Sequence, residues 1–251
     1  MRNTICMVLL TFLFFNIQAV KPDSLFSAAN NLYSEEKYED AAVTYEEILK
    51  TGYTSSEVLF NLGNSWFRSN KLGKARLYYE KALLLSPRDK AIRANLAYTE
   101  TLLPDKFEEV PVFFLRKWII SLRNIIAPNT WSILALSVFF ISFVFLVTFL
   151  FSKKIAIKKV TFYIGITFFF VSLVCLLFAF AASNHLHNSG TAILTEPFVT
   201  VKSAPRESGK DLFIIHEGAK VWLETKAGEW QEVRIADGRI GWLQSSAIER
   251  I

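Results

Sequence analysis

Two long runs of apolar residues occupy the middle of the chain. They cover residues 131–151 and 160–182, and neither contains a charged side chain. A helix of about 21 residues spans roughly 31 Å, the thickness of the hydrocarbon core of a bilayer. A buried helix of a soluble domain is seldom apolar over more than about 14 residues, so this alternative fits poorly. We therefore expect a two-helix transmembrane hairpin at residues 131–182.

A cluster of lysines between the two runs predicts the orientation of the hairpin. The cluster consists of Lys153, Lys154, Lys158 and Lys159. Short loops rich in lysine and arginine stay in the cytoplasm. We expect a cytoplasmic loop at residues 153–159 and both flanking segments on the outer side. Arg116, Lys117 and Arg123 argue against this orientation, but they are fewer and more widely spaced.

The N-terminal residues 1–19 have the pattern of a secretory signal peptide. Arg2 precedes an apolar run at residues 5–15, and the small residue Ala19 follows it. Cleavage is expected after Ala19, and an uncleaved anchor remains the alternative. In both cases the next segment would be exported.

Residues 22–103 repeat at an interval of 34 residues. The aligned pairs include Leu25 and Leu59, Ala29 and Gly63, Leu32 and Trp66, Ala41 and Ala75, and Tyr45 and Tyr79. This period, with small residues where helices touch, resembles the tetratricopeptide repeat and implies an all-α stack of helix pairs. A further helix at residues 89–103, ended by Pro104, is expected to cap the stack. Thr54 with Glu57, and Ser86 before Pro87, are the expected helix N-caps.

The resemblance implies a concave groove lined by the first helix of each repeat. The expected groove residues are Phe26, Asn30, Tyr33, Phe60, Asn61, Asn64, Phe67 and Tyr98. Asparagine amides pair with the backbone of an extended peptide, so the expected partner is another protein. The alternative is that these aromatic side chains only pack between repeats. Some family members clamp a terminal carboxylate with cations, but Phe26, Ala91 and Asn95 stand at those positions here.

The linker at residues 104–130 contains an amphipathic helical pattern over residues 112–126. Apolar residues recur at positions 114, 115, 118, 119 and 122, and three cations fall on the other face. With Trp118 on its apolar face, this segment suits a helix that lies on a membrane surface and contacts lipid. A helix packed on the repeats is the alternative.

Residues 188–251 change to the period-two pattern of β-strands. Six short runs rich in β-branched residues are separated by turn signals such as Glu217-Gly218, Ala227-Gly228 and Asp237-Gly238. The order of residues, including VKSAP and DGRIGWLQSS, resembles the bacterial SH3 domain and implies a small all-β barrel. The expected ligand-binding surface contains Trp222, Trp230 and Trp242; burial of these side chains in the core is the alternative.

The exported segments lack the residues of an enzyme, a metal site or a nucleic-acid-binding surface. Cys6 and Cys175, the two cysteines of the chain, fall in apolar segments, and no nucleophile, phosphate-loop or dinucleotide motif is present. His185 and His187 lie together without an evident third ligand. The net charge of +5 owes four positive charges to the lysine cluster between the spans. We expect no enzymatic activity, no cofactor, no metal and no nucleic acid.

The full order of parts resembles the BatE-type proteins of the Bacteroides aerotolerance cluster. The resemblance implies a multidomain membrane protein of a bacterial inner membrane, with both soluble domains periplasmic. It also implies a scaffold that works with membrane proteins bearing von Willebrand factor A domains and with a MoxR-type ATPase. A protein that binds or senses cell-wall peptide through the SH3 domain is the alternative.

Overall fold

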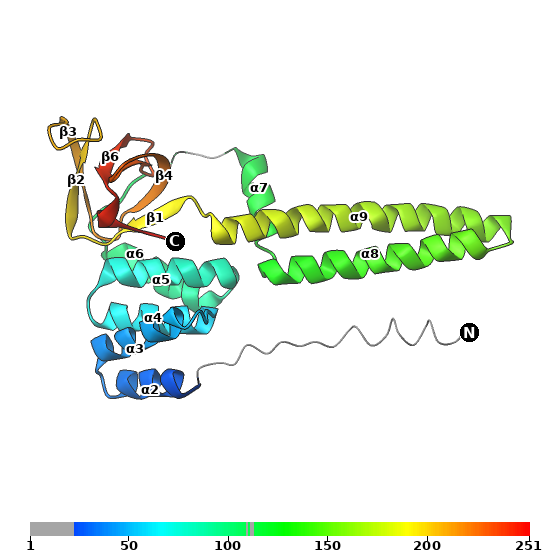
Figure 1. Cartoon of the computed structure of the whole chain (residues 1–251), viewed down its shortest axis with the longest axis horizontal. Helices are drawn as coiled ribbons and strands as arrows, with labels where there is room; N and C mark the ends of the chain where they lie inside the picture. The colour runs from blue at the N-terminus through cyan, green and yellow to red at the C-terminus, as the bar shows by residue number, and fades with distance from the viewer. Residues whose placement is uncertain (1–22, 109, 111–112) are drawn as a thin grey trace.

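The computed structural model describes residues 23–108, 110 and 113–251. The expected signal peptide, residues 1–19, lies outside the described residues. Figure 1 shows three parts, which are a stack of short helices, a long helical hairpin and a small β-sheet.

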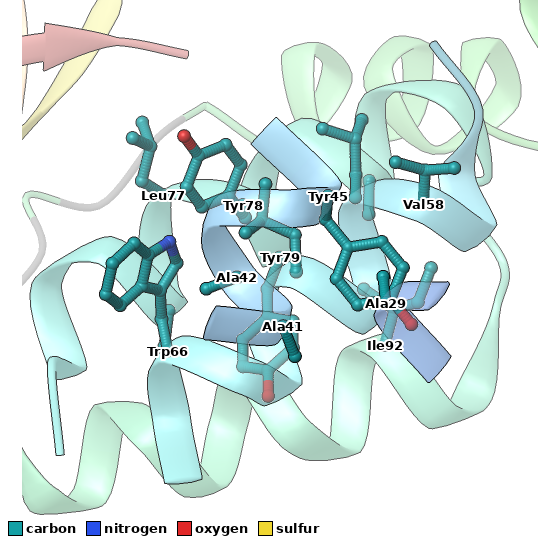
Figure 2. Packing of buried hydrophobic residues seen from close by; sticks show 14 of the residues in the cluster. Ala29, Ala41, Ala42, Tyr45, Val58, Trp66, Leu77, Tyr78, Tyr79 and Ile92 are labelled. Atoms are coloured by element: carbon teal, nitrogen blue, oxygen red, sulfur yellow. The ribbon is translucent and has the colours of Figure 1, made fainter. Parts of the chain in front are cut away.

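The helical stack has the architecture that the 34-residue period predicts. Its helices are α2 (Asp23–Ser34), α3 (Tyr38–Lys50), α4 (Ser56–Arg68), α5 (Leu72–Leu85) and α6 (Lys90–Leu102). Close helix contacts require small residues. A Cβ placed on Gly63 would lie 2.6 Å from Cε1 of Tyr79, and Ala41 and Ala75 are fully buried. Tyr45 and Tyr79 fill the space between the helices (Figure 2).

Two helices of the stack begin at other N-caps than the sequence predicts. Ser55, rather than Thr54, caps α4 by accepting the backbone N–H of Val58 at 3.2 Å. Asp89 caps α6, because a turn that includes Pro87 delays the start of that helix to Lys90. The hydroxyl of Ser86 instead donates to that of Ser56 at 2.9 Å.

The hairpin consists of α8 (Pro128–Phe151) and α9 (Ile155–His187). Small side chains form its seam. Ser142 Oγ donates to the carbonyl of Gly165 at 2.8 Å, and Ala135 and Ala179 are buried. The large apolar side chains face outward, and only 11% and 17% of the most apolar windows of the two helices are buried. Both helices are therefore long and apolar enough to cross a membrane, and a soluble core does not account for them.

The connection within the hairpin is shorter than the sequence predicts. Residues 152–154 alone are non-helical, and Lys158 and Lys159 lie within α9. Hydropathy marks where the apolar run begins, whereas the backbone helix starts earlier and includes polar residues.

The linker forms helix α7 (Phe114–Arg123), which lies across the hairpin rather than along it (Figure 1). No residue of α7 is buried, and Phe114 and Trp118 are each 71% exposed. The indole Nε1 of Trp131 donates to the carbonyl of Arg123 at 2.9 Å and ties the end of α7 to α8. The described contacts of α7 are thus with the hairpin, and its apolar face is open.

The C-terminal segment is one antiparallel sheet of seven strands in the order β3-β2-β6-β5-β4-β1-β7. The strands are β1 (Thr191–Leu194), β2 (Phe198–Lys202), β3 (Asp211–His216), β4 (Lys220–Ala227), β5 (Trp230–Arg234), β6 (Ile240–Gln244) and β7 (Ile248–Arg250). All six runs that the sequence indicates are strands, and β7 is an addition.

The sheet docks on α5 of the repeats through β1 and the β3–β4 turn. Strand β1 is buried on both faces, because Ile193 packs into the repeat core while its neighbours Ala192 and Leu194 face the sheet core. Lys71 gives α5 no side-chain cap, and the carboxylate of Glu217 accepts the N–H of Gly73 at 2.9 Å instead. The sheet therefore supplies the N-cap of a repeat helix.

Two ion pairs and one hydrogen bond frame this interface. They are Lys220–Glu80 at 2.7 Å, Lys81–Glu249 at 3.0 Å, and Arg76 Nη1 to the carbonyl of Gly218 at 2.8 Å. The segment that leaves α6 continues the contact. Asp105 accepts the backbone N–H of His216 at 2.6 Å and also pairs with its ring Nδ1 at 2.8 Å. Repeats and sheet form one unit.

Candidate functional site

The first helices of the successive units, α2, α4 and α6, together line a cavity of about 170 Å³. Its lining comprises Tyr33, Asn64, Phe67, Arg68, Tyr79, Asn95 and Tyr98. We call this the groove cavity. It is open to solvent on the side of Tyr98, which is 58% exposed.

Asn64 is the polar centre of the groove cavity. Its Oδ1 accepts the hydroxyl of Tyr79 at 2.8 Å and the Nδ2 of Asn95 at 2.8 Å. Within the described part of the chain, neither the Asn64 amide nitrogen nor the Asn95 side-chain oxygen has a partner. One unpaired donor and one unpaired acceptor therefore face the same cavity, as the peptide groups of an extended chain require.

The same asparagine–tyrosine pair occurs one repeat earlier. Asn30 accepts the hydroxyl of Tyr45, and both residues lie 34 positions before Asn64 and Tyr79. Burial raises the pKa of Tyr45 to about 12, although a hydrogen bond with Asn61 opposes the shift. These amides hold buried hydroxyls in place, in addition to any contact with a ligand.

The eight groove residues expected from the sequence divide into two sets. Tyr33, Asn64, Phe67 and Tyr98 line the groove cavity. Phe26, Asn30, Phe60 and Asn61 lie outside it. Phe26 and Phe60 pack against the core tyrosines, each with ring centroids 5.9 Å from its partner.

Two residues of the groove cavity were not predicted as ligand contacts. Asn95 lies 34 residues after Asn61, so the repeat period marks its position. Arg68 has no such signal. Its guanidinium lies 4.6 Å from the centre of the Tyr38 ring, and no carboxylate pairs with it among the described residues. The cavity therefore carries a positive charge at its rim.

The strand register places the three tryptophans on one face of the sheet. Trp222 lies opposite Arg234, Trp242 opposite Glu232, and Trp230 opposite Gln244. The intervening residues Val233 and Leu243 are fully buried, so the tryptophans occupy the outer side of the pleat. All three are half-buried, and Trp230 lines a surface cavity of about 250 Å³ together with Phe198 and Lys202.

The histidines take structural positions. His216 is held by Asp105, and His185 lies in the last turns of α9. Across residues 23–108, 110 and 113–251, no three His, Cys, Asp or Glu side chains come together as a metal site requires.

One comparison with known proteins gives a match. The tetratricopeptide repeat family model matches residues 56–89, which include α4 and α5. A search of the curated proteins finds no match to the chain. The helix pair α2–α3 repeats the matched pair at the 34-residue interval, so the helical part consists of tetratricopeptide repeats.

Proposed function

We propose that this protein is a membrane-anchored, non-enzymatic scaffold whose repeats bind an extended segment of a partner protein. The observation that carries the proposal is the groove cavity, where an unpaired amide donor and acceptor lie between the aromatic rings of Phe67 and Tyr98. Repeats of this family generally serve protein–protein interaction. The uncompensated charge of Arg68 favours a partner segment with an acidic side chain.

The hairpin provides the anchor in this proposal. Support comes from the outward-facing apolar side chains of α8 and α9 and from the open apolar face of α7. We place the repeats and the sheet in the periplasm and the lysines near residues 153–159 in the cytoplasm. Alkaline phosphatase fused after Ile251 should then be active, and a fusion after Lys154 should be inactive. The reverse pattern would overturn this topology.

The resemblance in the order of parts indicates the class of partner. We propose membrane proteins with von Willebrand factor A domains as direct partners, in a system that includes a MoxR-type ATPase. Purification of the full-length protein from native membranes in mild detergent, followed by mass spectrometry, identifies what is bound.

The groove assignment is tested by replacing two exposed residues of the cavity. Tyr98→Ala with Arg68→Gln should reduce co-purification of the main partner at least tenfold, because one aromatic anchor alone contributes about 2 kcal/mol or more at a protein interface. Val43→Ala is the matched control, because Val43 is 48% exposed on α3 and lies outside the groove cavity. Undiminished recovery with the double variant would remove the groove assignment.

A second candidate function is supported by the tryptophan face of the sheet. Half-buried indoles beside a surface cavity offer a binding site for a cell-wall peptide. Trp230→Ala in the full-length protein should then abolish retention on purified peptidoglycan while the main partner still co-purifies. Retention that is equal for the wild type and the variant would exclude this function for the face.

A further inference from the structure

A second polar cavity, of about 180 Å³, lies where the repeats meet the hairpin. Its wall includes Arg93 from α6, Arg123 from the end of α7 and His185 near the end of α9. We call it the junction cavity. Its volume is far above the roughly 15 Å³ that one water molecule requires, so it has room for a small polar group.

The junction cavity has an excess of positive charge. Glu80 also lines it, but this carboxylate is paired with Lys220 at 2.7 Å. Arg93 and Arg123 form no ion pair among the described residues. Burial lowers the pKa of the Arg123 guanidinium, as expected for a cation that loses water without gaining a counterion.

Both guanidinium groups are positioned by one edge and open at the other. Arg93 Nε donates to the carbonyl of Pro87 at 2.8 Å, and Arg123 Nε donates to Asn124 Oδ1 at 3.1 Å. The terminal amino groups of the two arginines have no partner within the described residues. Such paired N–H groups match the oxygens of a phosphate.

The cavity lies at the level expected for lipid headgroups. Ala182 and Leu186, near the end of the second apolar helix, form part of its wall. Trp131 stacks on Phe178 nearby with ring centroids 5.0 Å apart, and tryptophan is enriched at the membrane–water interface. Helix α7, which lies across the hairpin, ends at the cavity with Arg123.

We propose that the junction cavity binds the phosphate of an anionic phospholipid, with Arg93 and Arg123 as its ligands. The inference rests on the membrane anchor proposed above. The lipid would lie against α9 beside Ala182 and would join the repeats to the bilayer at a fixed point.

Native mass spectrometry of the full-length protein in mild detergent, titrated with phosphatidylglycerol, tests the proposal. The double variant Arg93→Gln/Arg123→Gln should bind this lipid about thirty-fold more weakly, a change of about 2 kcal/mol at 1.4 kcal/mol per tenfold. The matched control is Arg116→Gln/Lys117→Gln, which removes two exposed charges of α7 outside the cavity and should change binding less than about twofold. Equal losses in both double variants would overturn the site in favour of diffuse attraction.

Competition with free phosphate distinguishes a lipid ligand from a soluble anion. Millimolar inorganic phosphate should not displace the lipid; binding of phosphate alone, without lipid, would overturn the lipid assignment. If near-ultraviolet circular dichroism shows that the glutamine variant misfolds, Arg93→Lys/Arg123→Lys replaces it, and lipid binding equal to wild type would refute the paired N–H geometry. Extraction of the protein by alkaline carbonate would refute the anchor itself, whereas a retained protein with unchanged lipid binding in the glutamine variant would refute the cavity alone.

Discussion

Gly218 is the position at which a single methyl group should separate the sheet from the repeats. Its φ of +83° is a left-handed conformation, and a Cβ at this position would collide with the side chain of Leu103. Leu103 is 4% exposed and therefore has no open space into which to move. Gly218→Ala should cost about 1–2 kcal/mol for the left-handed backbone and about 1–3 kcal/mol for overpacking.

Gly228 supplies the matched control for this change. Its φ is +61°, and nothing lies within 4 Å of a Cβ built on it. Gly228→Ala should thus carry the backbone cost without the collision. The two variants of the full-length protein should differ by about 1–3 kcal/mol, or roughly 2–12 °C in melting temperature at about 2–4 °C per kcal/mol.

Hydrogen exchange at Gly73 shows whether the loss occurs at the interface. The N–H of Gly73 lies in the first turn of α5, where no helical carbonyl is available, and it bonds to Glu217. Its exchange should accelerate in Gly218→Ala and remain slow in Gly228→Ala. Equal melting temperatures with unchanged protection of Gly73 would refute the argument that this turn docks the sheet.

Three further predictions concern the repeat core. Ala75→Trp should lower the melting temperature of the full-length protein, because Ala75 is fully buried and overpacking costs about 1–3 kcal/mol; an unchanged midpoint would contradict the helix contact. Asn64→Ala should destabilise the protein by about 1–3 kcal/mol, because the buried hydroxyl of Tyr79 loses its acceptor; chemical denaturation measures this loss. The raised pKa of Tyr45 means that the unfolded state releases its proton first, so stability should be full below pH 10 and should fall as the pH approaches 12. Tyr45→Phe should reduce that fall, and a pH profile identical to that of wild type would contradict it.

Local and periodic features of the fold could be predicted from the sequence. The 34-residue interval places the helix pairs because each close contact requires a small residue at a fixed position, as Gly63 and Ala75 show. The same interval also contains the pairing of Asn30 with Tyr45 and of Asn64 with Tyr79, since both members recur. The β-strands follow from their alternating pattern and their glycine turns.

The contacts between distant segments could not be predicted. Glu80 and Lys220 are separated by 140 residues, and each reads as an ordinary surface charge in its own segment. The same holds for Glu217, which caps α5, and for Arg68, whose role depends on the cavity around it. Helix starts were also misplaced where Ser, Thr and Asp lie within one turn, because each of these residues is a competent cap.

The docking of the sheet on α5 has a consequence for biogenesis. Lys81 and Glu249 meet across 168 residues of sequence, and the whole hairpin lies between them. At about 5–20 residues per second, ribosomes need roughly 8 to 34 s to complete that stretch. For this interval the α5 surface, with its tyrosine Tyr78, waits without its cover. A chaperone that shields a nascent repeat surface would act on this protein during that interval, and premature cleavage by proteases should fall in the same period.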